Sequence, residues 1–402
     1  MKCNTWALSV AILATVLPGL CCMAGTARSE AAGSGEVVDG NTAFAVDLYR
    51  HLSADEGNLF ISPYSISLAM GMTYGGARGN TAVEMAGVLH FPGDHEALHP
   101  AFRRLSRTLA ETAAETGQRI NIANALFLTG GDVSPGYKAL LKDAYDAEIF
   151  RGRVDMINAW VEEKTEGKID TILEQLSPDT VCAILNAIYF KGLWENPFDE
   201  DFTREAPFAV APGKEAAVPL MYQKSDLKVL SKDGFRAASF PYEGERLSMV
   251  ILLPDDADGL PALEEQLTPQ DLKKWLDELD NTPSEEFDVY LPRFTLESEY
   301  DLVQPFKTLG MHDAFEENLA DFTGMGWRKG ELWIGQIKHK AFVEVNEEGT
   351  EAAAATAVEM ITKVAKPTPV FRADHPFLFL IRDNDTGTLL FLGRLVDPTP
   401  QA

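Results

Sequence analysis

Two histidines one helical turn apart are the first residues here whose types and spacing could do chemistry. His95 and His99 lie in HEALH, the H-E-x-x-H pattern with which zinc peptidases bind their metal and position a glutamate base. That chemistry needs both histidines on one helix face, and Pro100 disfavours helical dihedrals at His99. The sequence offers no clear third ligand. We therefore interpret the segment as a polar loop entering a helix and predict no metal site.

Other reactive groups are few, and their surroundings favour structural roles. The sequence contains no G-x-S-x-G nucleophile motif, no Walker loop and no C-x-x-C pair. Cys182 lies within the apolar run TVCAILNAIYF, which predicts a buried structural cysteine rather than a nucleophile. Arg103, Arg104 and Arg107 form a basic cluster on one predicted helix. We favour a solvated face over a polyanion site there, because the chain is so acidic.

The overall charge narrows the classes of partner. The 402 residues carry a formal net charge of −26, which argues against nucleic acid or an anionic membrane as the main partner. With 46% hydrophobic residues, the chain is long and apolar enough to bury a large core.

The N-terminus has the pattern of a secretory signal peptide. Lys2 supplies a positive charge, Trp6–Leu20 is an apolar run, and small residues follow, which predicts cleavage after Ala24 and a signal spanning about residues 1–25. A bacterial lipid attachment at Cys21 or Cys22 is an alternative, although PGLCC matches that signal poorly. We find no other apolar run of membrane length. We therefore expect an exported protein, secreted or periplasmic, without a membrane span.

The pattern of residues predicts mainly helices early in the chain and mainly strands later, and these elements must position any site. Ser62 before a proline predicts a helix start, and Thr81 with Glu84 is spaced as a capping box. Strand-like segments follow, and the last two flank Asn384–Gly387, a pattern typical of a hairpin. That turn contains a glycosylation sequon, which a tight turn explains equally well. The arrangement predicts a mixed α+β domain.

The stretch from Asn346 to Pro369 combines small residues with an alternation that suits a strand. From Thr350 onward every second residue is small or apolar and uncharged, whereas Glu351 and Glu359 both fall on the other face. This is the pattern of a half-buried strand. Alanine runs are also commonly helical, so the pattern alone leaves strand and helix open.

Several motifs across the chain resemble the serpin family of serine protease inhibitors. VEVNEEGTEAAAATA resembles the serpin hinge region, and FRADHPFLFLI resembles the family signature. NLFISPYSISLAM, LNAIYFKGLWENPF, LPRFTLESEYDL, LGMHDAF, ADFTGM and LFLGRLVDP resemble further serpin segments in family order. The resemblance covers most of the chain. It implies a single α+β domain over residues 36–400 with a large central mixed sheet, two smaller sheets, about nine helices and a reactive-centre loop at residues 347–369.

The function implied by this resemblance is irreversible inhibition, not catalysis. In serpins a serine protease attacks the exposed loop and forms an acyl-enzyme, and the loop then inserts as a strand into the central sheet. A strand of roughly 14 residues at about 3.3 Å each spans about 45 Å, so the attached protease would be carried across the molecule. The implied partner is a target serine protease held covalently by a monomeric inhibitor, and no cofactor is implied.

The resemblance also implies roles for individual residues. Glu347 resembles the glutamate at the base of the loop, Arg293 its basic partner, and Trp194 the tryptophan where the loop first enters the sheet. The polar cluster that holds the strands shut is implied at Ser62, Ser65, Asn186 and His339. The implied hinge residues are Glu347, Gly349, Thr350, Glu351, Ala352, Ala353, Ala354 and Ala355.

The reactive bond follows from the same resemblance, with alternatives left open. Counting the family's spacing from Glu347 places it at Lys363–Val364, and a lysine there implies a trypsin-like target. Counting back from HPF shifts it to Ala365–Lys366, which suits an elastase-like enzyme, and cleavage after Met360 or Thr362 is also open. The second interpretation of the chain is a non-inhibitory serpin with a binding, chaperone or storage role. The small, uncharged hinge residues argue against it.

Overall fold

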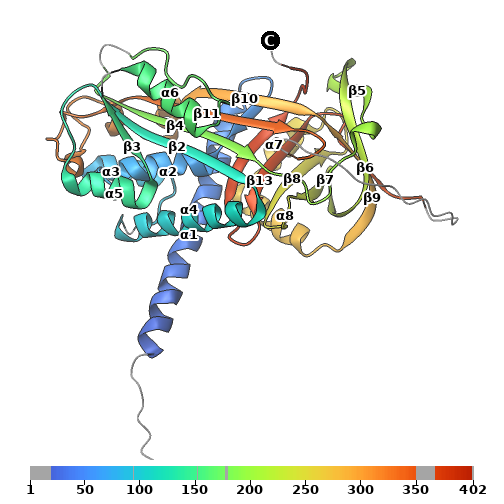
Figure 1. The fold of residues 1–402 in the computed structure, drawn as a ribbon, viewed down its shortest axis with the longest axis horizontal. Helices are drawn as coiled ribbons and strands as arrows, with labels where there is room; N and C mark the ends of the chain where they lie inside the picture. Colours follow the sequence, from blue (N-terminus) through green and yellow to red (C-terminus); the bar gives the residue numbers. More distant parts are fainter. Residues whose placement is uncertain (1–19, 94, 152, 177–179, 350–366, 401–402) are drawn as a thin grey trace, which may run out of the picture.

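The computed structural model describes residues 20–93, 95–151, 153–176, 180–349 and 367–400 (Figure 1). Its helices are α1 (Leu20–Leu52), α2 (Pro63–Tyr74), α3 (Gly79–Val88), α4 (His95–Thr116), α5 (Pro135–Tyr145), α6 (Val154–Lys164), α7 (Leu260–Gln266), α8 (Pro269–Asp280) and α9 (Val303–Leu309), with 3₁₀ turns η1 (Glu200–Phe202), η2 (Asp313–Phe315) and η3 (Thr323–Met325). Its strands are β1 (Leu59–Ile61), β2 (Arg119–Leu128), β3 (Glu148–Arg151), β4 (Cys182–Lys191), β5 (Arg204–Ala211), β6 (Lys214–Lys232), β7 (Phe235–Pro241), β8 (Leu247–Pro254), β9 (Ser284–Pro292), β10 (Phe294–Asp301), β11 (Ile334–Val345), β12 (Val370–Arg372), β13 (Phe377–Asp383) and β14 (Leu389–Leu395).

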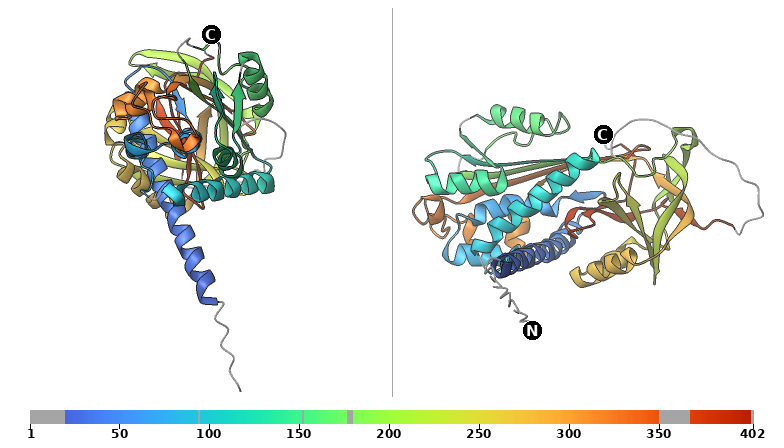
Figure 2. Two further views of the ribbon diagram at one scale, coloured as in Figure 1. Left: turned by 90° about the vertical axis from the view of Figure 1, so that its left-hand side faces the viewer. Right: turned by 60° about the horizontal axis from the view of Figure 1, so that its bottom comes forward.

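Two sheets and the helices around them make up the described part of the chain, which confirms the predicted α+β class. The strands β5, β6 and β9 lie at one end of the molecule and the helices α3 and α5 at the other (Figures 1 and 2). None of the helices within the described ranges is both long and apolar enough to cross a bilayer.

The five-stranded sheet has the order β10-β11-β4-β2-β3 and contains a parallel pair at its centre. β11 runs antiparallel to β10 but parallel to β4, with His339 opposite Asn186 and Ala341 opposite Ile188. β4 in turn runs antiparallel to β2. We call the junction between β4 and β11 the seam. Parallel pairing is slightly less stable per residue than antiparallel pairing, so the seam is a weaker junction than its neighbours.

β4 is buried on both faces, because its residues alternate between two hydrophobic cores. Ile184 and Ile188 pack into the main core. Ala183, Leu185 and Ala187 pack into a second core beneath α6. This two-sided burial explains why its sequence, CAILNAIYFK, is almost continuously apolar.

The remaining strands form one nine-stranded sheet, in the order β1-β14-β13-β8-β7-β6-β9-β12 with β5 beside β6. The 19-residue strand β6 pairs along its length with β5, β9 and β7. Two smaller sheets were expected from the sequence. The length of β6 instead joins them into one hydrogen-bonded path. The hairpin expected around Asn384–Gly387 is present between β13 and β14.

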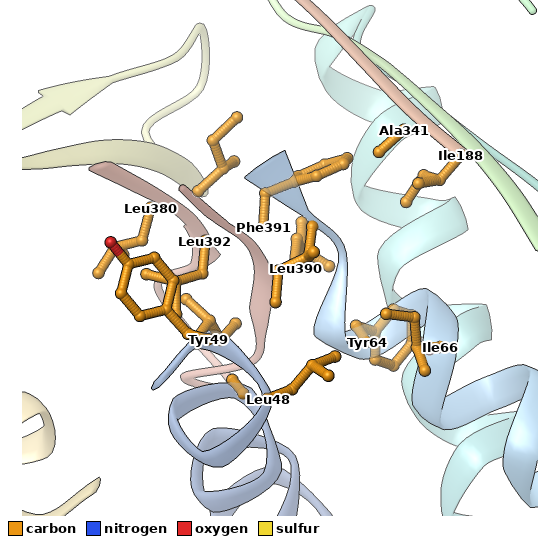
Figure 3. Close-up of a cluster of buried hydrophobic side chains, with 14 of the residues drawn as sticks. Leu48, Tyr49, Tyr64, Ile66, Ile188, Ala341, Leu380, Leu390, Phe391 and Leu392 are labelled. Carbon is orange, nitrogen blue, oxygen red and sulfur yellow. The ribbon is translucent and has the colours of Figure 1, made fainter. Parts of the chain in front are cut away.

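The main core lies between the first helices, the β13–β14 hairpin and the five-stranded sheet (Figure 3). Side chains from α1, α2 and both sheets meet there, and the labelled ones are Leu48, Tyr49, Tyr64, Ile66, Ile188, Ala341, Leu380, Leu390, Phe391 and Leu392. Packing in this core holds α2 and the β13–β14 hairpin against the face of the five-stranded sheet that carries the seam.

Two helix starts differ from expectation. α4 begins at His95 and continues through Pro100, so the predicted interruption at His99 is wrong. Pro100 is the sixth residue of α4, beyond the first four N–H groups that lack a partner within a helix, so it removes one backbone hydrogen bond that the 22-residue helix tolerates. The expected capping box is also wrong: α3 begins at Gly79, and Glu84 instead accepts hydrogen bonds from the backbone N–H groups of residues 312 and 313.

Candidate functional site

Glu347 follows β11, and its buried carboxylate forms an ion pair with the partly exposed side chain of Arg293. Its carboxylate, in a residue only 1% exposed, accepts hydrogen bonds from Arg293 Nη2 and Thr203 Oγ1, each at 2.5 Å. Burial by itself raises the pKa of this carboxyl, but the hydrogen bonds from Arg293 and Thr203 outweigh burial and leave the pKa below its usual value. Glu347 is therefore ionised at neutral pH and tied to β10 and β5 through their preceding loops.

Trp194 secures the residues on either side of Glu347. Its backbone N–H donates to the carbonyl of Glu348 at 2.9 Å, and its indole Nε1–H donates to the carbonyl of Asn346 at 3.0 Å. The indole ring stacks on Tyr242 with centroids 4.6 Å apart. We call Trp194, Thr203, Arg293 and residues 346–349 the loop base.

Gly349 ends the loop base in a conformation that requires glycine. Its φ is +141°, and a Cβ atom there would lie 2.2 Å from the carbonyl oxygen of Gly192. The backbone of Gly349 and Asn346 closes a tight turn through hydrogen bonds in both directions. The turn reverses the chain at the top of β11, beside the backbone bridge to Leu193.

A second group of polar side chains lies beneath the seam. His339 Nε2 accepts from the backbone N–H of Ser62 at 3.2 Å, and Nδ1 donates to Asn186 Oδ1 at 2.6 Å. Asn186 Nδ2 donates to Ser65 Oγ at 2.5 Å and to Asn124 Oδ1 at 2.6 Å. We call Ser62, Ser65, Asn124, Asn186 and His339 the polar cluster.

The electrostatics of the polar cluster keep His339 neutral. The backbone N–H of Ser62 can only donate, so Nε2 must be the unprotonated nitrogen of the ring. Burial lowers the pKa of His339 to about 3, in agreement with this tautomer. Ser62 Oγ donates to the carbonyl of Leu390, which joins the cluster to the hairpin. The His339–Asn186 bond itself crosses the seam.

The structure brings most of the predicted residues together in two separate groups. Glu347, Arg293 and Trp194 meet at the loop base, and Ser62, Ser65, Asn186 and His339 meet in the polar cluster. At about 3.3 Å per residue, the stretch of β11 from His339 to its end at Val345 spans roughly 20 Å, and Glu347 lies two residues further on. The predicted reactive and hinge residues Lys363, Val364, Thr350, Glu351, Ala352, Ala353, Ala354 and Ala355 lie outside the described residues.

Two residues of the loop base and the polar cluster were not predicted from the sequence motifs. Asn124 lies in the strand INIANALFL, directly opposite Asn186 across the β2–β4 pair. The signal was present, since each asparagine interrupts an otherwise apolar strand. Thr203 lies in a polar segment after η1, and nothing in the sequence around it marks a partner for Glu347.

Within HEALH, the side chain of His99 has a partner outside the motif. His99 Nδ1 lies 2.6 Å from the hydroxyl of Tyr145, which occupies one ring nitrogen. Among the residues that the structure describes, no three or more His, Cys, Asp or Glu side chains gather closely enough to hold a metal ion.

The chain is similar to known proteins over nearly its whole length. A family model described as "Serpin (serine protease inhibitor)" matches residues 39–398. Serpin B6 of Pongo abelii is 40% identical, over 90% of this chain and 99% of its own. Leukocyte elastase inhibitor of Bos taurus is 42% identical, over 89% of this chain and 98% of its own. The crystal structure of the thermophilic serpin tengpin in its native state superposes with a TM-score of 0.81 at 29% identity, over 90% of this chain and 94% of that one.

These relatives overturn the predicted export. Serpin B6 and leukocyte elastase inhibitor are intracellular serpins of the ovalbumin type, so the expectation of a secreted or periplasmic protein is wrong. Apolar runs too short to span a bilayer occur in core helices as well as in signal peptides, so the run at Trp6–Leu20 did not decide location.

Proposed function

The chain belongs to the serpin family, a family of protease inhibitors rather than enzymes. We propose that this chain traps serine proteases as a suicide substrate. The protein would act as a monomer with one domain over residues 36–400. Its reactive-centre loop, residues 347–369, would be cleaved by the protease. The acyl-enzyme would then be trapped as the loop inserts into the seam.

The observation that carries this proposal is the parallel seam next to the loop base. A chain that turns at Gly349 and runs back along β11 is antiparallel to β11, and also to β4, because β4 and β11 are parallel. Insertion therefore replaces one parallel junction with two antiparallel ones. Antiparallel pairing is the more stable arrangement per residue, and the new strand adds a ladder of backbone hydrogen bonds on each side. The antiparallel pairing and the added hydrogen bonds both favour insertion once cleavage frees the end of the loop.

We propose that the loop base keeps the uncleaved loop out of the seam. Glu347 is fixed by Arg293 and Thr203, and Trp194 holds the carbonyls of Asn346 and Glu348. The first residues to insert must leave these partners. Opening the sheet also separates His339 from Asn186, and so the polar cluster acts as a latch at the middle of the seam.

Trapping follows from geometry rather than from a catalytic group on this chain. While the acyl ester lies in the protease active site, the oxyanion hole and histidine base of the protease stabilise the transition state of deacylation. Carrying the ester across the molecule pulls it away from those groups, and hydrolysis stalls. We propose Lys363–Val364 as the reactive bond and a trypsin-like protease as the target, with Ala365–Lys366 and an elastase-like target as the alternative.

The test is to incubate the protein separately with trypsin, elastase and subtilisin and to separate the products on denaturing gels. We expect a covalent complex with at least one enzyme, and mass spectrometry of the released C-terminal peptide then identifies the bond. A peptide beginning at residue 364 supports Lys363–Val364, and one beginning at residue 366 supports the alternative. Cleavage by every protease without any complex would reject the inhibitor function.

A further inference from the structure

A row of contacting aromatic and arginine side chains lies on the outer face of the nine-stranded sheet, next to the loop base. The row consists of Phe202 from η1, Tyr222 from β6, Tyr290 from β9 and Arg372 from β12, and we call it the aromatic row. We propose that the aromatic row is a docking surface for the protease that attacks the loop. This inference rests on the proposed function and names a second contact between inhibitor and enzyme.

Contacts between the four side chains make the row continuous. The rings of Phe202 and Tyr222 meet edge to face with centroids 6.2 Å apart, and Tyr222 and Tyr290 lie 5.0 Å apart. The Arg372 guanidinium lies 4.6 Å from the centroid of Tyr290. Tyr222 is directly opposite Tyr290, and Tyr290 is directly opposite Arg372, so the row crosses three neighbouring strands on one face.

That face points away from the core. The residues next to the row along each strand, Met221, Val289 and Phe371, are fully buried on the opposite face. On the row's own side Phe202 is 42% exposed, and Val370, two residues before Arg372, is 46% exposed. Side chains of this kind (Phe, Tyr and Arg) are typical of the residues that dominate protein–protein binding energy.

Both described ends of the loop lie at this row. Thr203, the residue after Phe202, donates a hydrogen bond to the carboxylate of Glu347, the first residue of the proposed loop. On the returning side, Lys224 Nζ donates to Thr368 Oγ1 at 3.1 Å, and Val370 opens β12. A protease that attacks the chain between these two described ends would come close to the aromatic row, which would then serve as its second contact.

The charges beside the row indicate the kind of surface it fits. Asp226 and Glu286 are directly opposite each other on β6 and β9, and both are exposed. Like charges so placed repel each other, and the ion pair between Lys224 Nζ and Glu286, at 3.7 Å, offsets this repulsion in part. A partner that brings basic side chains relieves this repulsion. The row thus suits a protease with an apolar patch bordered by lysine or arginine beside its substrate cleft.

The test measures binding without cleavage. Trypsin and elastase, each with the catalytic serine replaced by alanine, are titrated against the wild-type inhibitor and against Phe202→Ala, Val370→Ser and Val83→Ala. Val83 lies on α3 and is 68% exposed, so it controls for loss of an exposed apolar side chain elsewhere. We expect Phe202→Ala and Val370→Ser to raise the Kd about tenfold or more, and Val83→Ala to leave it unchanged.

The outcomes separate this inference from the proposed function. Equal Kd values for all four proteins, or no binding to either inactive enzyme, would overturn the docking surface. Covalent trapping by the active enzymes is scored independently on gels. Row-dependent binding without trapping would support the docking surface and reject the inhibitor function. A melting curve for each variant shows whether it is folded. If Phe202→Ala does not fold, the binding of Val370→Ser alone tests the docking surface.

Discussion

At the scale of single residues, two buried ionisable groups lie along β11 or just after it, and one of them is ionised while the other is neutral. Glu347 at the loop base is ionised, because Arg293 and Thr203 donate to it and hold its pKa below the usual value despite its burial. His339 in the polar cluster is neutral, because burial lowers its pKa to about 3. A charged contact thus holds the point where insertion begins, and a neutral hydrogen bond holds the middle of the seam.

Stability should depend on pH through His339. The native ring stays neutral until about pH 3, whereas the unfolded ring binds a proton below its usual pKa of 6.5, so stability falls as the pH falls from 6.5 toward 3. Between pH 7 and pH 5 this group removes about 2 kcal/mol. Urea unfolding of the wild type and of His339→Asn at both pH values measures the difference. An identical loss in both proteins would contradict a buried neutral histidine.

Replacing Gly349 with alanine should destabilise the loop base. The positive φ and the approach to Gly192 leave no room for a Cβ atom, which predicts a loss of about 1–3 kcal/mol in the free energy of unfolding. Gly87→Ala is the matched control. Gly87 lies in α3 with nothing within 4 Å of the added methyl group, so stability should hold or rise slightly. Equal melting temperatures for Gly349→Ala and the wild type would show that the turn is not strained by a side chain.

At the scale of elements, β11 is bound differently on its two sides. Toward β10, Lys338 and Lys340 form ion pairs with carboxylates on that strand, including Lys340 Nζ–Glu299 Oε2 at 3.0 Å. Toward β4, the residues on the same face are apolar, with Leu185 opposite Lys338 and Ala187 opposite Lys340. Separating β11 from β4 therefore breaks none of these ion pairs, whereas separating β11 from β10 breaks them.

The hinge prediction belongs to this scale, because it depends on which face of the inserted strand is buried. Thr350→Arg places a charge on the face expected to enter the sheet, and burying an unpaired charge costs several kcal/mol. We expect this variant to be cleaved without forming a covalent complex. Glu351→Arg, one residue on and on the opposite face, is the control and should still trap. Denaturing gels after incubation with a protease that the wild type traps measure both, and trapping by Thr350→Arg would contradict insertion.

The sequence predicted individual elements well where a pattern was local and poorly where distant partners decided. The Ser62 start of α2 and the β13–β14 hairpin depend on neighbouring residues, and both are present. Glu84 was misassigned, because the backbone N–H groups that it accepts from belong to residues 312 and 313, more than two hundred residues away. Asn124 joined the polar cluster only through the pairing of β2 with β4.

At the scale of the whole molecule, we propose that the five-stranded sheet can accept one more strand between β4 and β11. Its family and class followed from motifs spread along the chain, because segments packed in one core constrain each other's sequence. Location did not follow, because an apolar N-terminal run has the same composition in several contexts. The direction of β4 relative to β11 is also a property of the whole fold and cannot be obtained from either strand alone.

The most direct test of the account is to lock the seam. Ile188 and Ala341 are directly opposite each other across it, so Ile188→Cys with Ala341→Cys can form a disulfide that joins β4 to β11. Ser298→Cys with Ala341→Cys places a control bond between β10 and β11 instead. With a protease that the wild type traps, we predict that the oxidised seam-locked protein is cleaved without a covalent complex, that reduction restores trapping, and that the control traps in both states. Equal trapping by the oxidised and reduced seam-locked protein would contradict strand insertion between β4 and β11.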